Sequence, residues 1–352
     1  MNATNVHSRK FFLAQLGFTA VALLFSSPTL VSASDTLRTL ADQRGLYFGC
    51  AVEIRPIEVE ALYQNIVNRE CNTITPANSL KFDTVHPSAT SYDFTEADTI
   101  RNFASSSKQT MRGHTLVWDQ ALPRWVTQKN RSRADAMTIL RDHIYTVVGR
   151  YRGQFYAWDV VNEAVGEDGN LKKSYWLDKI GTDYVSLAFQ WAREADSSAS
   201  LCYNDYGGEG FGVKSDGIYR LLDNLKTQGT PIDCVGLEMH LNGEAPPNFT
   251  DIKANMRRLA ELGLQVHITE LDVRLEKPFS ETKLATQAGI YRSALESCLG
   301  EPSCDSFGMW GITDKYSWVT RVFKNWGSAL IFDGKFNPKP AYFSLINTFL
   351  GL

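Results

Sequence analysis

The sequence predicts a single-domain α/β protein folded as a (β/α)8 barrel, also called a TIM barrel, on three observations. Eight short apolar or β-branched runs recur along the chain, and each is followed by a stretch with helical periodicity. Strict alternation of strands and helices favours a parallel sheet, and eight repeats favour a closed barrel. No Gly-rich nucleotide-binding fingerprint follows the first run, which counts against an open doubly wound sheet.

The predicted strands are the apolar runs 47–52, 72–75, 110–118, 157–161, 200–203, 234–239, 265–269 and 306–312. Apolar residues at helical spacing predict helices at 58–70, 96–107, 133–150, 184–195, 215–228, 251–262 and 281–299, with a last one at 341–349. No linker, internal repeat or low-complexity tract interrupts this order. We therefore expect one catalytic barrel domain over residues 34–352.

The composition is that of an ordinary globular protein, with 43% apolar and 21% charged residues in 352. The formal charge of −3 and a pI near 6.1 leave no basic surplus for a nucleic acid backbone. A neutral substrate fits this balance better than a polyanion. We expect no nucleic acid partner and no membrane association of the mature chain.

The first 33 residues have the pattern of a secretory signal peptide. Arg9 and Lys10 precede an apolar run over 11–25, and Val31-Ser32-Ala33 supplies the small residues of a cleavage site. The stretch 8–13 also resembles a twin-arginine export signal whose second arginine is lysine. We predict cleavage near Ala33 and a secreted or periplasmic protein.

Polar side chains follow the predicted strands at the end where a barrel builds its active site. They are His114, Trp118, Asn162, Glu163, Asn204, Asp205, Glu238, His240, Glu270, Asp272 and Asp314. Glu163 and Glu270 each end a hydrophobic run. Two carboxylates at strand ends are what hydrolysis of a glycosidic bond requires, one as proton donor and one as nucleophile.

Six motifs occur in the order found in the family-ten glycoside hydrolases, the β-1,4-xylanases of barrel fold, and the chain resembles that family from about residue 37 to 350. The motifs are Ser79-Leu80-Lys81-Phe82, Gly113-His114-Thr115-Leu116-Val117-Trp118, Asn162-Glu163, Tyr203-Asn204-Asp205-Tyr206, Ile268-Thr269-Glu270-Leu271-Asp272, and the run from Trp310 to Trp318. The resemblance implies a retaining endo-β-1,4-xylanase that needs no cofactor or metal. Its implied partner is β-1,4-linked xylan or a related plant cell-wall polysaccharide, and we expect a monomer.

Within this resemblance, Glu163 is the implied general acid/base and Glu270 the implied nucleophile. A retaining mechanism needs these carboxyls about 5–5.5 Å apart. Asn162 is expected to bind the sugar 2-hydroxyl, and His240 to hold the nucleophile. The implied substrate-binding residues are Asn78, Lys81, His114, Trp118, Asn162, Tyr206, Glu238, His240, Trp310 and Trp318. For the histidine, lysine and tryptophans, the competing interpretation is a purely structural role in the barrel mouth.

Three positions depart from the family pattern. Ala77 stands where a glutamate is common, and Asp119-Gln120-Ala121 replaces a His-Ser-Gln or His-Asn-Gln run. We expect fewer hydrogen bonds to the sugar one step beyond the cleaved unit on the non-reducing side, with Gln120 as a partial replacement. Glu238 replaces a glutamine, so either it is tolerated beside Lys81 or His114, or its charge shifts the pH–rate profile.

All six cysteines lie in the mature part of the chain, where export would permit disulfides. Cys298 and Cys304 flank a turn-like stretch and resemble a family disulfide, so we expect them to be bridged. Cys50, Cys71, Cys202 and Cys234 lie inside apolar runs, which favours buried free thiols over bridges. Pairing of Cys50 with Cys71, or of Cys202 with Cys234, stays open.

Three other functions remain as alternatives. A retaining β-glycosidase for another β-glycan, or for a glycoside with a non-sugar aglycone, would keep the same chemistry. A metal-dependent barrel hydrolase could use His114, Glu163, His240 and Glu270 as ligands, although no His-x-His or His-Glu-x-x-His spacing occurs. A non-catalytic sugar-binding barrel is disfavoured because both glutamates are intact.

Overall fold

Strand β9 closes the sheet into a barrel, because it pairs in parallel with both β8 and β1. This computed structural model describes residue 1 and residues 35–352. The eight barrel strands are β1 (Tyr47–Val52), β2 (Thr73–Pro76), β3 (Thr110–Val117), β4 (Ala157–Asn162), β5 (Ser200–Asp205), β6 (Cys234–Leu237), β8 (Gln265–Glu276) and β9 (Ser306–Met309). All neighbours around the ring are parallel, so the predicted (β/α)8 barrel is confirmed.

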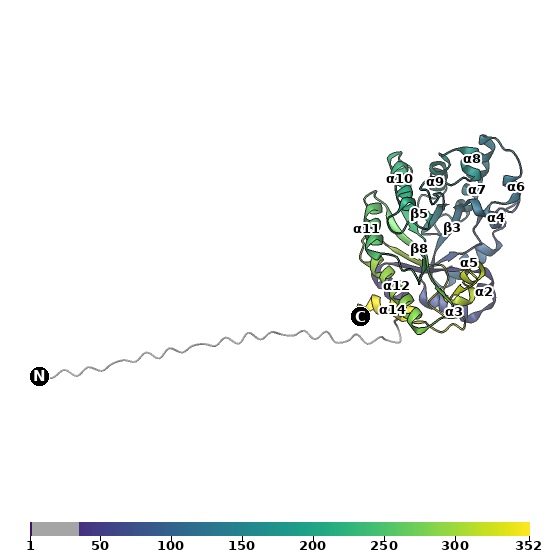
Figure 1. Cartoon of the computed structure of the whole chain (residues 1–352). Helices are drawn as coiled ribbons and strands as arrows, with labels where there is room; N and C mark the ends of the chain where they lie inside the picture. The colour runs from purple at the N-terminus through teal and green to yellow at the C-terminus, as the bar shows by residue number, and fades with distance from the viewer. Residues whose placement is uncertain (2–34) are drawn as a thin grey trace. The chain divides into compact units, whose positions relative to one another are not determined.

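Helices surround the strands, as Figure 1 shows for α7, α9, α10, α11 and α12. The longer helices are α1 (Leu37–Arg44), α2 (Ile54–Val59), α3 (Ala61–Glu70), α5 (Thr95–Ser106), α7 (Arg133–Arg150), α8 (Tyr175–Ile180), α9 (Tyr184–Ala195), α10 (Val213–Thr227), α11 (Phe249–Ala260), α12 (Glu281–Leu299) and α14 (Pro340–Leu350). Short pieces are α4 (Phe82–Val85), η1 (Asp119–Ala121), α6 (Arg124–Thr127), η2 (Asp314–Tyr316) and α13 (Val319–Val322). Helices α7, α9 and α12 have the predicted bounds. Side-chain caps mark two of these starts, from Ser132 in a capping box and from Ser280.

The predicted helix 58–70 is instead two helices that break at Glu60. The backbone of Glu60 is extended, with φ −122° and ψ 97°, and its carboxylate contacts Lys315 and Tyr316. The predicted strand 234–239 ends at Leu237 because Met239 turns the chain with φ 58°. A short strand β7 (His240–Asn242) then pairs with the extended end of β8, and β10 (Trp326–Gly327) pairs with β8 on its other side.

Two disulfides are present. Cys298–Cys304 is confirmed, whereas the expectation that Cys202 and Cys234 are free thiols is wrong, because these two form a bridge. Parallel register places Cys202 of β5 opposite Cys234 of β6 with their Cα atoms 4.4 Å apart. The sequence could not show this, since it does not fix register between neighbouring strands. Cys50 and Cys71 are buried thiols.

The predicted export signal over 1–33 lies outside the described residues apart from Met1. Among residues 35–352, no helix combines the length and apolarity needed to cross a bilayer.

Candidate active site

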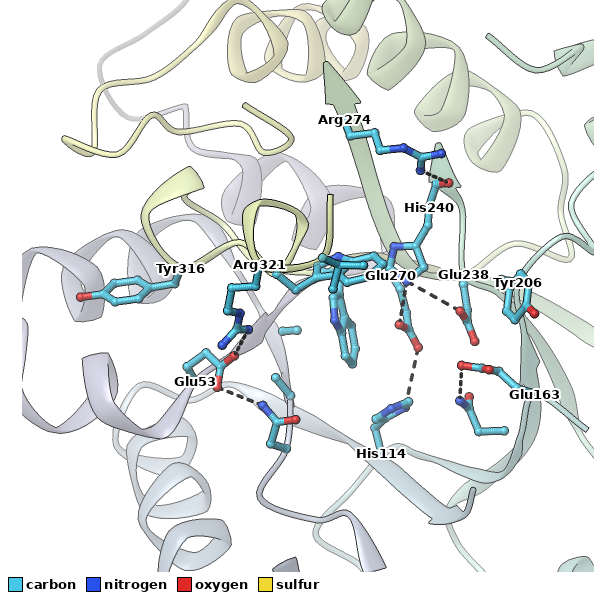
Figure 2. Close-up of a pocket in the computed structure, with 18 of the residues that line it drawn as sticks. Glu53, His114, Glu163, Tyr206, Glu238, His240, Glu270, Arg274, Tyr316 and Arg321 are labelled. Carbon is cyan, nitrogen blue, oxygen red and sulfur yellow. Dashed lines mark hydrogen bonds and ion pairs between the residues drawn. The ribbon is translucent and has the colours of Figure 1, made fainter. Parts of the chain in front are cut away.

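A cavity of about 780 Å³ opens at the carboxyl ends of the barrel strands. All twelve predicted site residues line it: Asn78, Lys81, His114, Trp118, Asn162, Glu163, Tyr206, Glu238, His240, Glu270, Trp310 and Trp318. Figure 2 shows Glu270 near the middle of the site, with Tyr206 on one side and Glu53, Arg321 and Tyr316 on the other. The barrel topology therefore gathers residues that are far apart in the sequence.

Glu163 is the first residue after β4 and adopts the left-handed conformation with φ 53°. A non-glycine residue at such φ is strained, and strain of this kind concentrates at functional sites. Its backbone N–H donates to the Asn204 carbonyl at 2.8 Å. Its carboxylate receives Gln120 Nε2 at 3.3 Å, Lys172 Nζ at 3.4 Å and Asn162 Nδ2 at 3.3 Å. The side chain is 12% exposed, so it is reachable from the cavity.

Glu270 lies within β8, and its side chain is only 6% exposed. Asn204 Nδ2 donates to Oε1 at 2.8 Å, and His240 Nε2 lies 3.2 Å from Oε2. His114 Nδ1 lies 3.8 Å from Oε1 on the opposite side, as Figure 2 shows. Fixed nitrogen donors around a carboxylate restrict its orientation.

A chain of hydrogen bonds joins the two glutamates. Asn162 donates to Glu163, accepts from Asn204 at 2.8 Å, and Asn204 donates in turn to Glu270. Thr269 Oγ1 donates to the Asn204 oxygen at 2.7 Å, which fixes the orientation of that amide. The two carboxylates thus keep a defined relative position while each has its own set of partners.

Asp272 supports His240 from behind. Asp272 is fully buried, and its Oδ2 accepts from His240 Nδ1 at 3.0 Å and from Trp318 Nε1 at 2.7 Å. Although burial alone would lower it, the negative charges of Asp272 and Glu270 raise the pKa of His240 well above its ordinary value. The ring is therefore held as an imidazolium that can donate to both carboxylates.

Below the cavity, a buried ion pair fills the barrel interior. The guanidinium of Arg112 bonds Asp159 at 2.5–3.2 Å, and Asp159 Oδ2 also lies 3.1 Å from His114 Nδ1. Burial opposes ionisation of Asp159, but the Arg112 charge outweighs it and lowers the pKa of Asp159 to about 2. This pair fixes the ring of His114 beneath Glu270.

Polar and aromatic groups line the cavity wall beside the acids. Lys81 Nζ donates to Asn78 Oδ1 at 2.9 Å and lies 4.8 Å from the ring centroid of Trp118. Burial lowers the pKa of the Lys81 ammonium, although the charge of Glu270 opposes that effect. The rings of His114 and Trp310 meet edge to face at 5.0 Å. Such walls can hold the apolar face and the hydroxyls of a sugar.

At the other side of the acids, cations surround the ring of Tyr206. Lys214 Nζ lies 3.0 Å and Lys172 Nζ 4.8 Å from its centroid. Lys214 also pairs with buried Asp205 at 3.0 Å. Because Lys172 contacts both Tyr206 and Glu163, this aromatic side chain is linked to the acid.

The residues that depart from the family pattern differ in whether they reach the cavity. Ala77 lines the cavity and adds no polar group there, whereas Ala121 is buried and is absent from the lining. Gln120 reaches Glu163, and Asp119 accepts from the backbone of Tyr175 at 2.8 Å. Gln120 thus brings an amide into the cavity.

Glu238 is a third carboxylate in the cavity and is 2% exposed. Its Oε1 lies 3.2 Å from Asn204 Nδ2, and its Oε2 lies 3.7 Å from His240 Nε2. Burial, followed by the charges of Glu270 and Glu163, raises the pKa of Glu238 well above its ordinary value. The protonated, neutral form of this side chain is therefore favoured.

Two groups of residues have the ligand types that bind metal ions. Glu238, His240 and Glu270 form one group, but both ring nitrogens of His240 already face carboxylates. Cys202, Cys234 and His267 form the other, but the two sulfurs are bonded to each other and offer no thiolate. Neither set is a preformed open site of the kind that catalytic zinc uses.

Sequence reasoning missed several residues that line the cavity: Glu53, Tyr63, Glu209, Arg274, Tyr316, Arg321 and Phe323. It also missed Lys172, which lies near the cavity through its contact with Glu163. Tyr63 and Arg321 lie in helices, so no strand-end pattern marks them, whereas Glu53 directly follows β1 and could have been found by that pattern. The sequence places Asn204 and Asp272 after predicted strands, and in the structure Asn204 contacts Glu270 while Asp272 contacts His240.

A closed parallel barrel with two glutamates on one polar, aromatic-walled cavity is the architecture of a glycoside hydrolase. The family model of glycosyl hydrolase family 10 matches residues 36–348. The chain therefore belongs to glycosyl hydrolase family 10.

Individual relatives agree with this membership. Endo-1,4-beta-xylanase B of Thermotoga neapolitana is 41% identical over 88% of this chain and 90% of its own length. The solved structure of native xylanase 10B from Thermotoga maritima is 39% identical, with a TM-score of 0.88 over 90% of this chain and 98% of that one. The xylobiose complex of xylanase 10B from Thermotoga petrophila RKU-1 has the same identity, coverage and TM-score.

Proposed function

We propose that this chain is a retaining endo-β-1,4-xylanase, with Glu270 as nucleophile and Glu163 as general acid/base. The observation that carries the proposal is the pair of glutamates joined through Asn162 and Asn204 on one cavity. The relatives named endo-1,4-beta-xylanase, and the relative solved with xylobiose, support xylan as the substrate.

The reaction proceeds in two steps. Glu270 attacks the anomeric carbon while Glu163 protonates the departing oxygen, and a glycosyl-enzyme forms. Water then hydrolyses this intermediate, with Glu163 now accepting a proton. The donors Asn204 and His240 hold the Glu270 carboxylate in place, and Asn162 binds the sugar 2-hydroxyl.

Binding uses both sides of the catalytic pair. Asn78, Lys81 and Trp118 would grip sugars on one side, with His114, Trp310 and Trp318 as the wall around the central unit. Tyr206 would contact the chain on the other side, across the acids from Glu53 and Arg321 in Figure 2. A cleft with sugar sites on both sides favours cleavage within a chain over cleavage at its end.

We also infer that residues 1–33 direct export and that the mature chain works as a monomer in a secreted or periplasmic location. Two disulfides suit an oxidising compartment. The expected mature amino terminus is Ser34, which amino-terminal sequencing of exported protein tests. Gel filtration with light scattering tests the monomer.

The deciding experiment is the product profile of the mature chain on linear xylo-oligosaccharides and cello-oligosaccharides, with Glu270→Ala as control. Internal cleavage of the xylose chains alone, absent in the variant, supports the proposal. Proton NMR of the first product should show retained β configuration, and inversion would overturn the assigned mechanism. Cleavage only of cello-oligosaccharides or aryl glycosides would point instead to another β-glycan or a non-sugar aglycone.

A further inference from the structure

We propose that Cys50 and Cys71 form a third disulfide bond in the oxidised protein. Their Sγ atoms lie 3.0 Å apart in this structure, where both are thiols. This separation is inside the about 3.5–4.0 Å at which even two unbonded carbon atoms come to rest. A disulfide needs about 2.05 Å, so the sulfurs must approach by only about 1 Å.

No other partner is open to these two residues. Of the six cysteines in the chain, four are already paired as Cys202–Cys234 and Cys298–Cys304. Cys50 and Cys71 are 2% and 0% exposed, so a bulky small-molecule thiol cannot cap either one in the folded protein. With the other four cysteines bridged, Cys50 and Cys71 are the one remaining pair, and their sulfurs are already in contact.

The backbone on both sides of the pair is firmly held. Cys50 lies inside β1, and Cys71 follows the last residue of α3. The Cys71 N–H donates to Val67 O at 3.0 Å, and Gln109 Nε2 donates to the Cys71 carbonyl at 2.9 Å. Asn72 N–H then donates to Phe48 O at 3.0 Å. Bond formation therefore fits the existing backbone and needs only a small shift of the side chains.

The bond forms by thiol–disulfide exchange with a disulfide oxidant, such as glutathione disulfide. One cysteine thiolate attacks the oxidant and releases one thiol, and the second cysteine then attacks the mixed disulfide and releases the other. Two electrons and two protons pass to the oxidant, which becomes two thiols. Burial, and then the neighbouring Cys50, raise the pKa of the Cys71 thiol well above its ordinary value. Exchange therefore belongs to folding, before the pair is covered.

The bridge would close a loop that forms one end of the cleft. Glu53 in this loop accepts from Asn78 Nδ2 at 3.1 Å and lies 3.5 Å from Arg321 Nη2. The ring of Tyr63 meets the ring of Tyr316 edge to face at 5.5 Å. Both Glu53 and Tyr63 line the cavity. A covalent closure at the base of the loop would hold this wall together independently of the catalytic residues.

Thiol counting on the wild-type mature chain tests the proposal. The reduced protein is refolded with glutathione disulfide and then denatured in guanidinium with iodoacetamide and without reductant. The number of alkyl groups on the intact chain is measured by mass spectrometry. We expect no alkyl group before reduction and six after it, with a linked peptide pair containing Cys50 and Cys71. Two alkyl groups, mapped to Cys50 and Cys71, would overturn the proposal, as would bridges between other pairs.

A variant supplies a second measurement. Cys71→Ala should leave one alkylated thiol, at Cys50, and lower the Tm by several degrees. Cys50→Ala should give the mirror result, with Cys71 alkylated. If Cys50 and Cys71 were each alkylated in wild type as fully as in the variant that lacks the other cysteine, the two thiols would be independent and the bridge absent. The wild-type measurement decides alone if either variant fails to fold.

Discussion

Glu238 and Glu270 compete for the same two nitrogen donors, and Glu270 has the shorter contact with each. Asn204 Nδ2 lies 2.8 Å from Glu270 and 3.2 Å from Glu238, while His240 Nε2 lies 3.2 Å and 3.7 Å away respectively. The two N–H groups of the Asn204 amide must also serve Asn162. Donors therefore suffice for one ionised carboxylate, and Glu238 is the group that must carry a proton.

Glu238→Gln should accordingly change the pH dependence more than the chemistry. The pKa of Glu238 is raised in the folded state by burial and then by Glu270 and Glu163, so the folded chain holds a proton that the unfolded chain releases. Stability is therefore lost as pH rises above the unfolded pKa of Glu, about 4.3. The glutamine variant should have a higher Tm than wild type at pH 8, with a smaller difference at pH 4.

The same variant should move the basic limb of kcat/KM to lower pH, because no second negative charge then forms near the acid Glu163 to oppose the loss of its proton. Glu58→Gln, at an exposed position, makes the same charge change away from the site and should shift neither quantity. If wild type and Glu238→Gln had the same pH profile of kcat/KM and the same Tm at both pH values, the ionisation of Glu238 would affect neither activity nor stability.

Asp272→Asn should lower kcat rather than raise KM. Asp272 holds His240, which donates to Glu270, and it also holds the indole of Trp318. Loss of the charge frees both rings, and a small misplacement of a reacting group costs about 100-fold in rate. Trp318→Phe is the matched control, since it removes the hydrogen bond to Asp272 and part of the aromatic ring but leaves the Asp272–His240 pair in place, and it should lower kcat far less. Equal losses in the two variants would place the role of Asp272 in the aromatic wall alone.

Asp159→Asn should destabilise the barrel strongly. It leaves the Arg112 guanidinium buried without its charge partner, which costs about 3–5 kcal/mol. The pKa of Asp159 is lowered to about 2 against burial, by Arg112, so its stabilising contribution is present above about pH 4. As pH falls toward 2, wild type should lose about 2 kcal/mol of this contribution.

Denaturant unfolding at pH 7 and at low pH measures both effects. Asp183→Asn is the control, because its pair with Arg133 is about half exposed on both sides and should contribute less than about 1 kcal/mol. A cost for Asp159→Asn no larger than this control would show that water reaches the barrel interior.

Chelation should leave the enzyme active. The proposed mechanism uses only carboxylates, and the two nitrogens of His240 are engaged by Asp272 and Glu270. Prolonged dialysis against EDTA should therefore leave kcat/KM on xylo-oligosaccharides unchanged. Loss of activity that a divalent cation restores would revive the metal-dependent alternative at Glu238, His240 and Glu270.

The barrel and the centre of its site could be predicted because both follow from local patterns. A strand that ends in Asn162-Glu163 places those side chains at the carboxyl edge wherever the strand pairs. The Cys202–Cys234 bridge depends on register between strands, which no local pattern records. Arg321 and Glu53 come from segments far apart in the chain and meet at one end of the cleft. Only the folded structure brings them together.

The split of the predicted helix 58–70 has a similar cause. Helical periodicity continues through Glu60, but its carboxylate is drawn to Lys315 and Tyr316 on a distant loop. Tertiary contacts thus override the local preference at one residue. The break also shapes the cavity, since the helix that follows carries Tyr63 to the cavity wall.

Gln120→Ala tests whether the amide beside Glu163 replaces the polar groups that the family usually has at this loop. Gln120 Nε2 donates to Glu163 Oε2 at 3.3 Å, and the Ala121 side chain that follows is buried away from the cavity lining. Loss of one such hydrogen bond to a charged group should cost about 1.5–3 kcal/mol, or roughly 10- to 100-fold in kcat/KM. Gln128→Ala, an exposed glutamine on the same segment, is the control and should match wild type. A loss confined to KM on longer xylo-oligosaccharides would assign Gln120 to sugar binding, whereas a loss in kcat on the shortest substrate would assign it to holding the acid.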